Sequence, residues 1–503
     1  MSQLRSHFLQ WFDRLGVPLV LFSLATLYLP IGRIFQFNPD EGIELAKVTL
    51  YSQGYSLYTE IWNDQPPLFT LALAQWWHWF GDSIVASRLL TLSFSALLAW
   101  AFYRCLRLHL ALAPALLGTV GLCLTYDFLR LSISVMRGLP ALALGMVSAY
   151  FLLRACQHPQ RQNRGFVLSG LCFALALQTK FFVGLMLPAM IIQLLIPRSS
   201  HAFSWQQRLG AMGIWSSTVT ITFLTVGIAT HALNLDQLLA PHLSTQARVA
   251  LTEVPSALYV LLFFVQDLDY TLLAGLALRL LWPLRQPAFL FPFTWLLSST
   301  LGLLAYTAIW SHYSPLIAIP TVWLAALALP SALAGWPVGL GTLRRREQTA
   351  SRPSLPKLNL KSWAVGLLLF ACCLAPIKVA LIGIKMGQFI KDSGTGFALV
   401  QQVNLYRSQT QWLMTDLPIL AFYTHLKVPP PTVVLSEKRL EAGDLAPETL
   451  QQVLDTYQPE QLVLGLYPPV EEALKSAIAQ DYTLVYHRKQ WKHYLRNTVS
   501  SRV

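Results

Sequence analysis

Long apolar runs, separated by short polar connections, follow one another from Val17 to about residue 386. A membrane-spanning helix needs about 20 mostly apolar residues, because the hydrocarbon core of a bilayer is about 30 Å thick. Runs of this kind begin at Val17, Ile84, Leu112, Gly138, Gly165, Phe182, Gly210, Ala257, Ala288, Pro315 and Trp363. The pattern predicts a polytopic α-helical membrane protein with about eleven spans.

The segment Pro67–Gly81 is apolar but shorter than these runs, and it is rich in tryptophan. Both features are typical of a helix that lies at the membrane interface instead of crossing. If it does not cross, the strongly basic loops all fall on the cytoplasmic side, as the positive-inside rule requires. These loops contain Arg104 and Arg107, Arg154 to Arg164, Arg198 and Arg208, Arg279 and Arg285, and Arg344 to Lys361. We therefore expect a plasma (inner) membrane protein whose loops 36–66 and 234–256 and C-terminal region are extracytoplasmic.

The composition agrees with this class of protein, since 54% of the residues are hydrophobic and only 12% are charged. A net charge of +13 would suggest a nucleic-acid partner in a soluble protein. Here the basic residues cluster in short loops, so the positive-inside bias accounts for them and no nucleic acid is expected. The six cysteines lie in apolar runs without metal-ligand spacing, so no disulfide framework is expected.

The first polar loop is unusually acidic for this chain. Five of its 24 acidic residues fall there: Asp40, Glu41, Glu44, Glu60 and Asp64. A carboxylate beside a bilayer is costly unless it faces water or a partner, so this loop is a candidate functional site. A plainer interpretation is helix capping, because Pro39 favours the first turn of a helix and acids suit its positive end.

The same topology places a second set of polar residues on the outer side. The cations are Arg130, Arg137, Lys180 and Arg248, and the other groups are His242, His312 and Tyr313. Each has a structural interpretation, since long cations snorkel to headgroups and interfacial histidines commonly satisfy local hydrogen bonds. Cations on the outer side nevertheless run against the positive-inside bias. Acids and cations together on one face indicate a site for an anionic, lipid-borne substrate.

From about residue 387 the apolar runs become short and alternate with polar helices. Strands are expected at 411–415, 432–436, 461–466 and 482–487, and helices at 417–426, 446–457 and 468–480. Alternating strands and helices predict a small α/β domain with a largely parallel sheet. Asp416, after the first strand, is expected to cap a helix. The chain is thus divided into a transmembrane catalytic domain, 1–386, and an extracytoplasmic α/β domain, 387–503.

Several of these segments resemble the GT-C glycosyltransferases, most of all the group of the protein O-mannosyltransferases and lipid A aminoarabinose transferases (glycosyltransferase family 39-like). The matching segments are Asp40-Glu41, Asn63-Asp64-Gln65-Pro66-Pro67-Leu68-Phe69, Phe80-Gly81, Arg88-Leu89-Leu90 and His312-Tyr313-x-Pro315, together with the trailing α/β region. One position departs from the aminoarabinose transferases, which have lysine where this chain has Gln65. The missing cation argues against lipid A as the acceptor.

The resemblance implies transfer of a sugar from a polyprenyl-phosphate donor to a lipid, glycan or protein acceptor, with inversion at the anomeric carbon. It implies Asp40 as the general base, with Glu41 as the second catalytic residue. Chemistry agrees, because the attacking hydroxyl must lose a proton while a phosphate leaving group needs cations. Candidate ligands of the donor phosphate are Arg137, Lys180, Arg130 and Arg248. Candidate substrate-binding residues are Asn63, Gln65, His312 and Tyr313.

Some GT-C enzymes use a divalent metal cation, and no other cofactor is expected. Asp64 and His242 are the candidate ligands here, since carboxylate oxygen and imidazole nitrogen both bind such ions. Apart from the donor, the acceptor and the membrane lipids, the sequence indicates no partner.

Two other classes of function remain as alternatives. A multi-span transporter or lipid-carrier flippase would use intramembrane acids as a proton relay. Against it, the charges gather at one face, and the chain does not consist of two matching halves. A non-catalytic membrane scaffold that presents the C-terminal region would leave the acidic cluster around Asp40 unexplained.

Overall fold

The computed structural model describes residues 15–157, 162–196, 204–234, 237–238, 255–282, 287–306, 309–334, 360–436, 439–440 and 443–500. Each of the eleven apolar runs contains a helix or a pair of helices. These are α2 (Val17–Tyr28), α5 (Ile84–Arg107), α6 (Leu112–Cys123), α8 (Gly138–Gln157), α9 (Gln162–Leu177), η3 (Phe181–Met186) with α10 (Leu187–Leu195), α11 (Trp205–Ala229), α14 (Ser256–Gln266) with α15 (Leu268–Leu281), α16 (Leu290–Ala305), α17 (Pro315–Ala334) and α18 (Leu360–Asn404).

Among the described residues, five helices are long and apolar enough to cross a membrane, or six if the pair α14–α15 is one span. That pair is bent by 87° at its break. The other apolar helices, such as α6 and α16, are shorter than 18 residues. The helices support an integral membrane protein, and the total of eleven spans stays a prediction.

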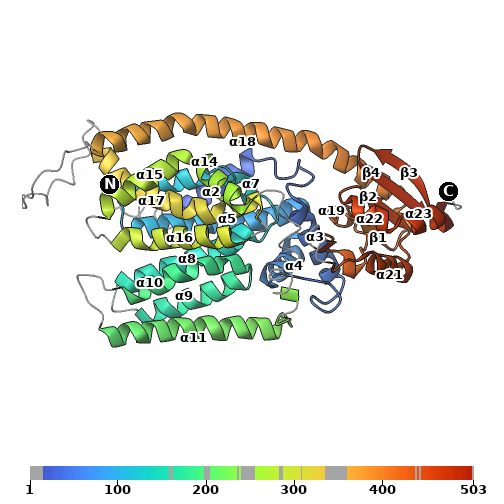
Figure 1. Cartoon of the computed structure of the whole chain (residues 1–503), viewed down its shortest axis with the longest axis horizontal. Coiled ribbons are helices and arrows are strands. Elements are labelled where there is room, and N and C mark those ends of the chain that lie inside the picture. Colours follow the sequence, from blue (N-terminus) through green and yellow to red (C-terminus); the bar gives the residue numbers. More distant parts are fainter. Residues whose placement is uncertain are drawn as a thin grey trace, which may run out of the picture.

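Two helices, α8 and α17, form the centre of the bundle. Their apolar windows are 78% and 83% buried by other parts of the protein, whereas that of α11 is only 17% buried. α8 packs against α5 and α9, and α11 packs on α9 at the edge of the bundle (Figure 1). The outward side chains of α11, such as Ile221 and Ile228, are exposed, as expected of a helix that faces lipid.

Two helices between α2 and α5 lie between the bundle and the C-terminal sheet (Figure 1). α3 (Pro39–Ser52) begins after Asn38, whose side chain accepts a hydrogen bond from the backbone N–H of Asp40. α4 (Leu68–Phe80) has 13 residues and ends at Gly81, which has a positive φ of 83°. The short tryptophan-rich helix is therefore present, and its place at the membrane interface stays a prediction.

The C-terminal sheet has the strand order β1-β2-β4-β3. β1 (Leu413–Thr415) pairs in parallel with β2 (Gln461–Leu464), while β4 (Trp491–Arg496) is antiparallel to both β2 and β3 (Tyr482–Arg488). The expectation of a largely parallel sheet is wrong, because a final hairpin supplies two of its four strands. Helices α21 (Pro447–Tyr457), α22 (Pro468–Ala473) and α23 (Lys475–Asp481) connect the strands.

Two local expectations in this region are also wrong. Residues 432–436 form no strand. They lie at the end of the 3-10 turn η7 (Pro430–Thr432) and after it. The three successive prolines that precede Thr432 have no backbone N–H group to donate to a sheet. Asp416 does not cap α19 (Ile419–Thr424). Its carboxylate accepts the backbone N–H groups of Gly465, Leu466 and Tyr467, at 3.0, 2.7 and 2.9 Å, and so fixes the loop after β2.

α18 joins the bundle to the C-terminal sheet as one helix of 45 residues (Figure 1). The expected domain boundary at 386/387 falls inside it, so the division into two domains stays a prediction. A second junction is the contact between α3 and α19. A Cβ on Gly42 would lie only 2.8 Å from the backbone nitrogen of Ile419, so the close approach of these helices requires glycine.

Candidate active site

Asp40 occupies the first turn of α3, where Asn38 and not Asp40 caps the helix. Its side chain is 54% exposed, and its Oδ2 lies 3.9 Å from Nε2 of His312. Desolvation raises the pKa of Asp40, and Lys180, Arg137 and Lys47 oppose that increase. Because water reaches half of the side chain, we expect these cations to keep the carboxylate ionised at neutral pH. An ionised, accessible carboxylate is the form that a general base needs.

Lys180 lies beside this carboxylate, just after α9. Its Nζ is 4.7 Å from the ring centre of Tyr313, a cation–π contact. No carboxylate in the described part of the chain lies within 4.0 Å of this ammonium group. Desolvation is the main cause that lowers the pKa of Lys180 to about 8, and Asp40 partly opposes the decrease. The ammonium group is thus charged at neutral pH and available to an anion.

Glu44, one turn after Asp40, connects the other cations. Nε of Arg137 donates to its Oε2 at 2.8 Å, and Nζ of Lys47 lies 3.1 Å from the same oxygen. Thr70 of α4 donates to Oε1. Burial opposes ionisation of Glu44, but these partners together outweigh it and lower the pKa of Glu44 to about 2. Glu44 therefore fixes the guanidinium of Arg137 at the site.

The segment around Asn63, one of those that resemble the GT-C enzymes, contacts Lys47. Asn63 is fully buried and accepts a hydrogen bond from Nζ of Lys47 at 3.0 Å. The backbone oxygen of Gln65 accepts hydrogen bonds from Tyr58 and from the Asn63 side chain, at 2.7 and 2.8 Å. These contacts fix the backbone around Asp64, whose charge influences both Asp40 and Lys180. Asn63 thus supports Lys47, while Gln65 contributes its main chain.

Glu41 points away from this group although it follows Asp40 directly. It is fully buried and forms a two-point ion pair with Arg88, at 2.9 and 3.0 Å. It also accepts the backbone N–H groups of Phe37 and Val135. Arg88 in turn donates to the carbonyls of Ile31 and Ile34. The pair fixes the start of α3 to α5, so its position favours a structural role, and the predicted catalytic role of Glu41 stays untested.

Arg130 is also engaged elsewhere. It lies in α7 (Phe128–Ser132), where its Nε donates to Asp127 at 3.0 Å. Asp127 also pairs with Lys385 of α18 at 3.0 Å, and Lys378 of the same helix pairs with Asp267 and Asp269 at 3.0 and 2.6 Å. We call Asp127, Arg130, Asp267, Asp269, Lys378 and Lys385 the bundle cluster. We call Asp40, Glu44, Lys47, Asp64, Arg137 and Lys180 the loop cluster.

A small cavity of about 20 Å³ lies beside the loop cluster. Lys180, His312 and Tyr313 form its polar end, and apolar side chains such as Leu142 and Leu316 form the rest. His312 is 8% exposed, and among the described residues its Nδ1 has no hydrogen-bond partner. The cavity therefore combines one cationic end with apolar walls, which suits a lipid phosphate.

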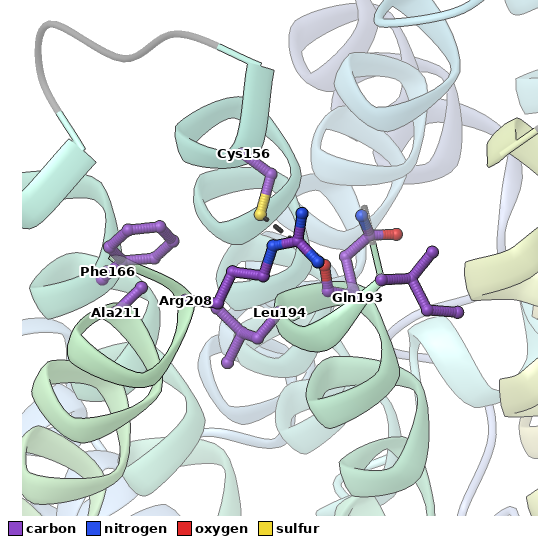
Figure 2. A pocket seen from close by; sticks show the side chains of 7 residues that line it. Cys156, Phe166, Gln193, Leu194, Arg208 and Ala211 are labelled. Atoms are coloured by element: carbon purple, nitrogen blue, oxygen red, sulfur yellow. Dashed lines mark hydrogen bonds between the residues drawn. The ribbon is translucent and has the colours of Figure 1, made fainter. Parts of the chain in front are cut away.

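A second, separate pocket is shown in Figure 2, around Cys156 at the end of α8 and Arg208 near the start of α11. α8 begins directly after Arg137 and ends at Gln157. Its 20 residues place this pocket a helix length, about 30 Å, from the loop cluster. It therefore lies too far away to take part in chemistry at Asp40.

The predicted metal pair is only partly described. His242 lies outside the described residues, as does Arg248. The described residues contain no group of three or more histidine, cysteine, aspartate or glutamate side chains that could hold a metal ion. Asp64 contributes charge to the loop cluster next to Asp40. Its role as a metal ligand stays a prediction.

No role was predicted from the sequence for Glu44, Lys47 or Thr70. A helical signal was present, because Asp40, Glu44 and Lys47 are spaced i, i+4 and i+7 and so share one face of α3. For Thr70 there was no such signal, since it reaches Glu44 from another helix.

Comparison with known proteins supports the resemblance. Residues 64–228, less than half of the chain, match the family model described as dolichyl-phosphate-mannose-protein mannosyltransferase. This stretch contains the Asn63 neighbour Asp64, Arg137 and Lys180. None of the curated proteins matches the chain in sequence.

Solved structures match over nearly the whole chain. ArnT from Cupriavidus metallidurans bound to undecaprenyl phosphate has a TM-score of 0.61 at 13% identity, covering 97% of this chain and 98% of that chain. Its apo state has a TM-score of 0.60 at 14% identity, covering 98% of each chain. The oligosaccharyltransferase AglB from Archaeoglobus fulgidus, in complex with an inhibitory peptide and a dolichol-phosphate, has a TM-score of 0.53 at 10% identity, covering 90% of this chain and 70% of that chain.

At these identities the likeness shows the fold. The chain has the fold of the GT-C glycosyltransferases, as the motifs led us to expect. Together with the family match, this fold supports a membrane glycosyltransferase that uses a lipid-linked sugar donor.

Proposed function

We propose that this protein is an inverting membrane glycosyltransferase that moves a sugar from a polyprenyl-phosphate donor to an acceptor hydroxyl at the outer face of the membrane. One observation carries the proposal. Asp40 is the accessible acid of the loop cluster, and it lies beside the ammonium group of Lys180 and an apolar cavity. Its neighbours Glu41 and Glu44 are held by cations instead.

The donor phosphate binds Lys180 and Arg137, and its polyprenyl chain follows the apolar walls of the cavity. ArnT, which shares this fold, binds undecaprenyl phosphate, and this supports the choice of lipid carrier. Lys180 supplies an ammonium group that has no fixed acid partner among the described residues, whereas Arg137 is preorganised by Glu44. Preorganised donors stabilise developing charge at little cost in reorganisation.

In the reaction, the acceptor oxygen attacks the anomeric carbon while Asp40 takes the hydroxyl proton. The bond between the anomeric carbon and the phosphate oxygen breaks, and its electron pair leaves with the polyprenyl phosphate. His312, at 3.9 Å from Asp40, helps to orient the carboxylate. Attack from the side opposite the phosphate inverts the anomeric configuration.

The orientation in the membrane is part of the proposal. Basic loops on one side and the loop cluster on the other support a cytoplasmic loop 335–359 and an extracytoplasmic C-terminus. A reporter fused after Ser351 is expected to show cytoplasmic activity, and one fused after Val503 extracytoplasmic activity. If both fusions report the same side, the proposed topology is wrong.

The catalytic role is tested by Asp40→Asn. Asparagine has nearly the same shape but cannot accept the proton, so transfer is expected to fall about 100-fold or more. Folding is expected to be retained, because Asn38 caps α3. The assay measures transfer from undecaprenyl-phosphate-linked hexoses and pentoses into the membrane fraction by purified, reconstituted protein, together with polyprenyl-phosphate binding.

Asp481→Asn is the matched control, since Asp481 is an exposed acid at the end of α23, far along the chain from the cluster. Loss of transfer with donor binding retained supports the base. Transfer by Asp40→Asn at the wild-type rate would overturn it.

A further inference from the structure

A second hollow lies beside the residues that directly precede Asp40. It has a volume of about 240 Å³ and lies between the residues that precede α3, one face of α18 and the C-terminal sheet. Asn38 and Pro39 form one wall, Asp392 and Thr395 of α18 a second, and Trp491 the third. It is larger than the cavity beside Lys180 and shares no lining residue with it.

The wall that carries Phe35 is rigidly built. The backbone N–H of Phe35 donates to Ser393 of α18 at 2.8 Å, and its carbonyl accepts from the Tyr423 hydroxyl at 3.0 Å. A Cβ on Gly396 would lie 2.3 Å from the Phe35 ring, so α18 can approach this closely only at glycine. Three distant parts of the chain thus hold the groove open next to Asp40.

The charges of the two hollows differ. The cavity beside Lys180 has a cationic end, whereas the groove contains no lysine or arginine among its lining residues, and its one charged group is Asp392. A lipid phosphate is therefore favoured at Lys180 and disfavoured in the groove. In an inverting transfer the acceptor and the phosphate need separate sites, because they lie on opposite sides of the anomeric carbon. The groove is separate from the cavity beside Lys180, and it borders Asn38 and Pro39, which directly precede Asp40.

The groove lining also indicates the acceptor chemistry. Amide, hydroxyl and carboxylate groups of Gln36, Asn38, Thr395 and Asp392 stand beside aromatic side chains, including Trp491. Such groups donate to and accept from sugar hydroxyls. A peptide strand would need an open sheet edge, but Leu466 follows the central strand β2 and Trp491 begins the central strand β4.

We propose that this groove is the acceptor site and that it binds an uncharged saccharide. The inference rests on the proposed function, because the saccharide hydroxyl is the group that attacks the anomeric carbon and gives its proton to Asp40. The glycosidic bond forms as the bond to the donor phosphate breaks. Asp392 and the absence of cations among the lining residues disfavour phosphorylated acceptors.

Blocking the groove tests its position. Thr395→Cys places a thiol in the groove, and labelling it with a bulky maleimide is expected to lower transfer into the membrane fraction about tenfold or more, because the acceptor path is filled. Polyprenyl-phosphate binding is expected to stay unchanged. Gly394→Cys is the matched control, because its side chain would point into open space one residue away on α18. Labelled wild-type protein controls for the native cysteines.

The outcomes separate the two proposals. If unlabelled wild-type protein transfers no sugar from any donor tested, the proposed function fails. If wild type transfers sugar and fully labelled Thr395→Cys does so at the rate of labelled Gly394→Cys, the groove is not the acceptor site and this inference is overturned.

The acceptor class is tested with octyl β-glucoside, octyl β-galactoside and octyl α-mannoside and with the 6-phosphate of each. We expect at least one neutral glycoside to be glycosylated, and its 6-phosphate to be used at least about tenfold less well because of Asp392. Asp392→Asn is expected to reduce the preference for the neutral glycoside over its 6-phosphate. Preferred transfer to the 6-phosphates, or to a serine- and threonine-containing peptide in place of every glycoside, would overturn the saccharide assignment.

Discussion

The loop cluster and the bundle cluster contain the same charges, three acids and three cations each, but differ in how these are paired. In the bundle cluster each described cation has a carboxylate within 3.0 Å. In the loop cluster Glu44 binds both Lys47 and Arg137, which leaves Asp40 and Lys180 without a direct ion pair to each other. Full pairing holds helices together, whereas incomplete pairing leaves groups available to a substrate.

The exposure of Asp40 agrees with this difference, although its neighbours Glu44 and Lys47 are as buried as the bundle cluster. The side chains of Asp267, Asp269 and Lys378 are at most 12% exposed, while that of Asp40 is 54% exposed. Buried, fully paired charges stabilise a particular arrangement of helices only while every partner remains. Charges inside a membrane protein therefore do not by themselves identify an active site. An accessible and incompletely paired acid is a better indicator of one.

The largest expected effect is on stability, in the bundle cluster. Lys378→Met leaves Asp267 and Asp269 buried without their shared cation, and removal of one partner of a buried pair typically costs about 3–5 kcal/mol. We expect a clearly lower midpoint of thermal unfolding in detergent, with transfer per folded molecule retained. The triple variant Lys378→Met, Asp267→Asn, Asp269→Asn should recover much of the loss. An unchanged midpoint for Lys378→Met would contradict a structural role for this cluster.

The next effect is on donor binding, in the loop cluster. Lys180→Met removes an ammonium group to which no carboxylate in the described ranges is bound, so the unfolding midpoint should change little. Loss of a charge-assisted hydrogen bond to phosphate corresponds to about 1.5–3 kcal/mol, or roughly a 10- to 150-fold weaker affinity. Titration of the reconstituted protein with undecaprenyl phosphate measures this. Equal affinity of Lys180→Met and wild type would remove Lys180 from the donor site.

The smallest effect concerns pH. The pKa of Lys180 is lowered to about 8, so below this pH the free protein already carries the charge that binds phosphate. Above it, binding must take up a proton, and affinity for undecaprenyl phosphate should fall by up to about tenfold per pH unit. Lys180→Arg should flatten this decline, since arginine stays protonated. The same decline in Lys180→Arg would assign the titration to another group, such as Lys47.

The sequence predicted the helices well, because long apolar runs beside basic loops have few other interpretations. It predicted the sheet less well. Residues Trp491–Arg496 mix aromatic and basic side chains and contain no apolar run, so β4 was missed. The turn before it uses Lys489 with φ 56°, a conformation that the residue type does not announce. The run Val433–Leu435 resembled a strand, but its side chains are buried within the C-terminal region and against α3.

The site was partly predictable for a related reason. The motif brought Asp40, Glu41 and Arg88 to attention, but a motif does not say which acid faces the substrate. That distinction depends on contacts across 47 residues between Glu41 and Arg88, and on the α3–α4 contact between Glu44 and Thr70. Neither pair follows a characteristic sequence spacing, because each joins residues of two separate helices.

The continuity of α18 has a mechanical consequence. A helix of 45 residues is about 67 Å long, more than twice the thickness of a hydrocarbon core. The middle of the helix contacts the bundle through Lys378 and Lys385, and its C-terminal end leads into the C-terminal sheet. A force applied to the sheet by a bulky cell-envelope polymer would therefore produce a torque on the helix at the bundle. A small rigid protein bound to the sheet would, by the same geometry, report the tilt of this helix in the bilayer.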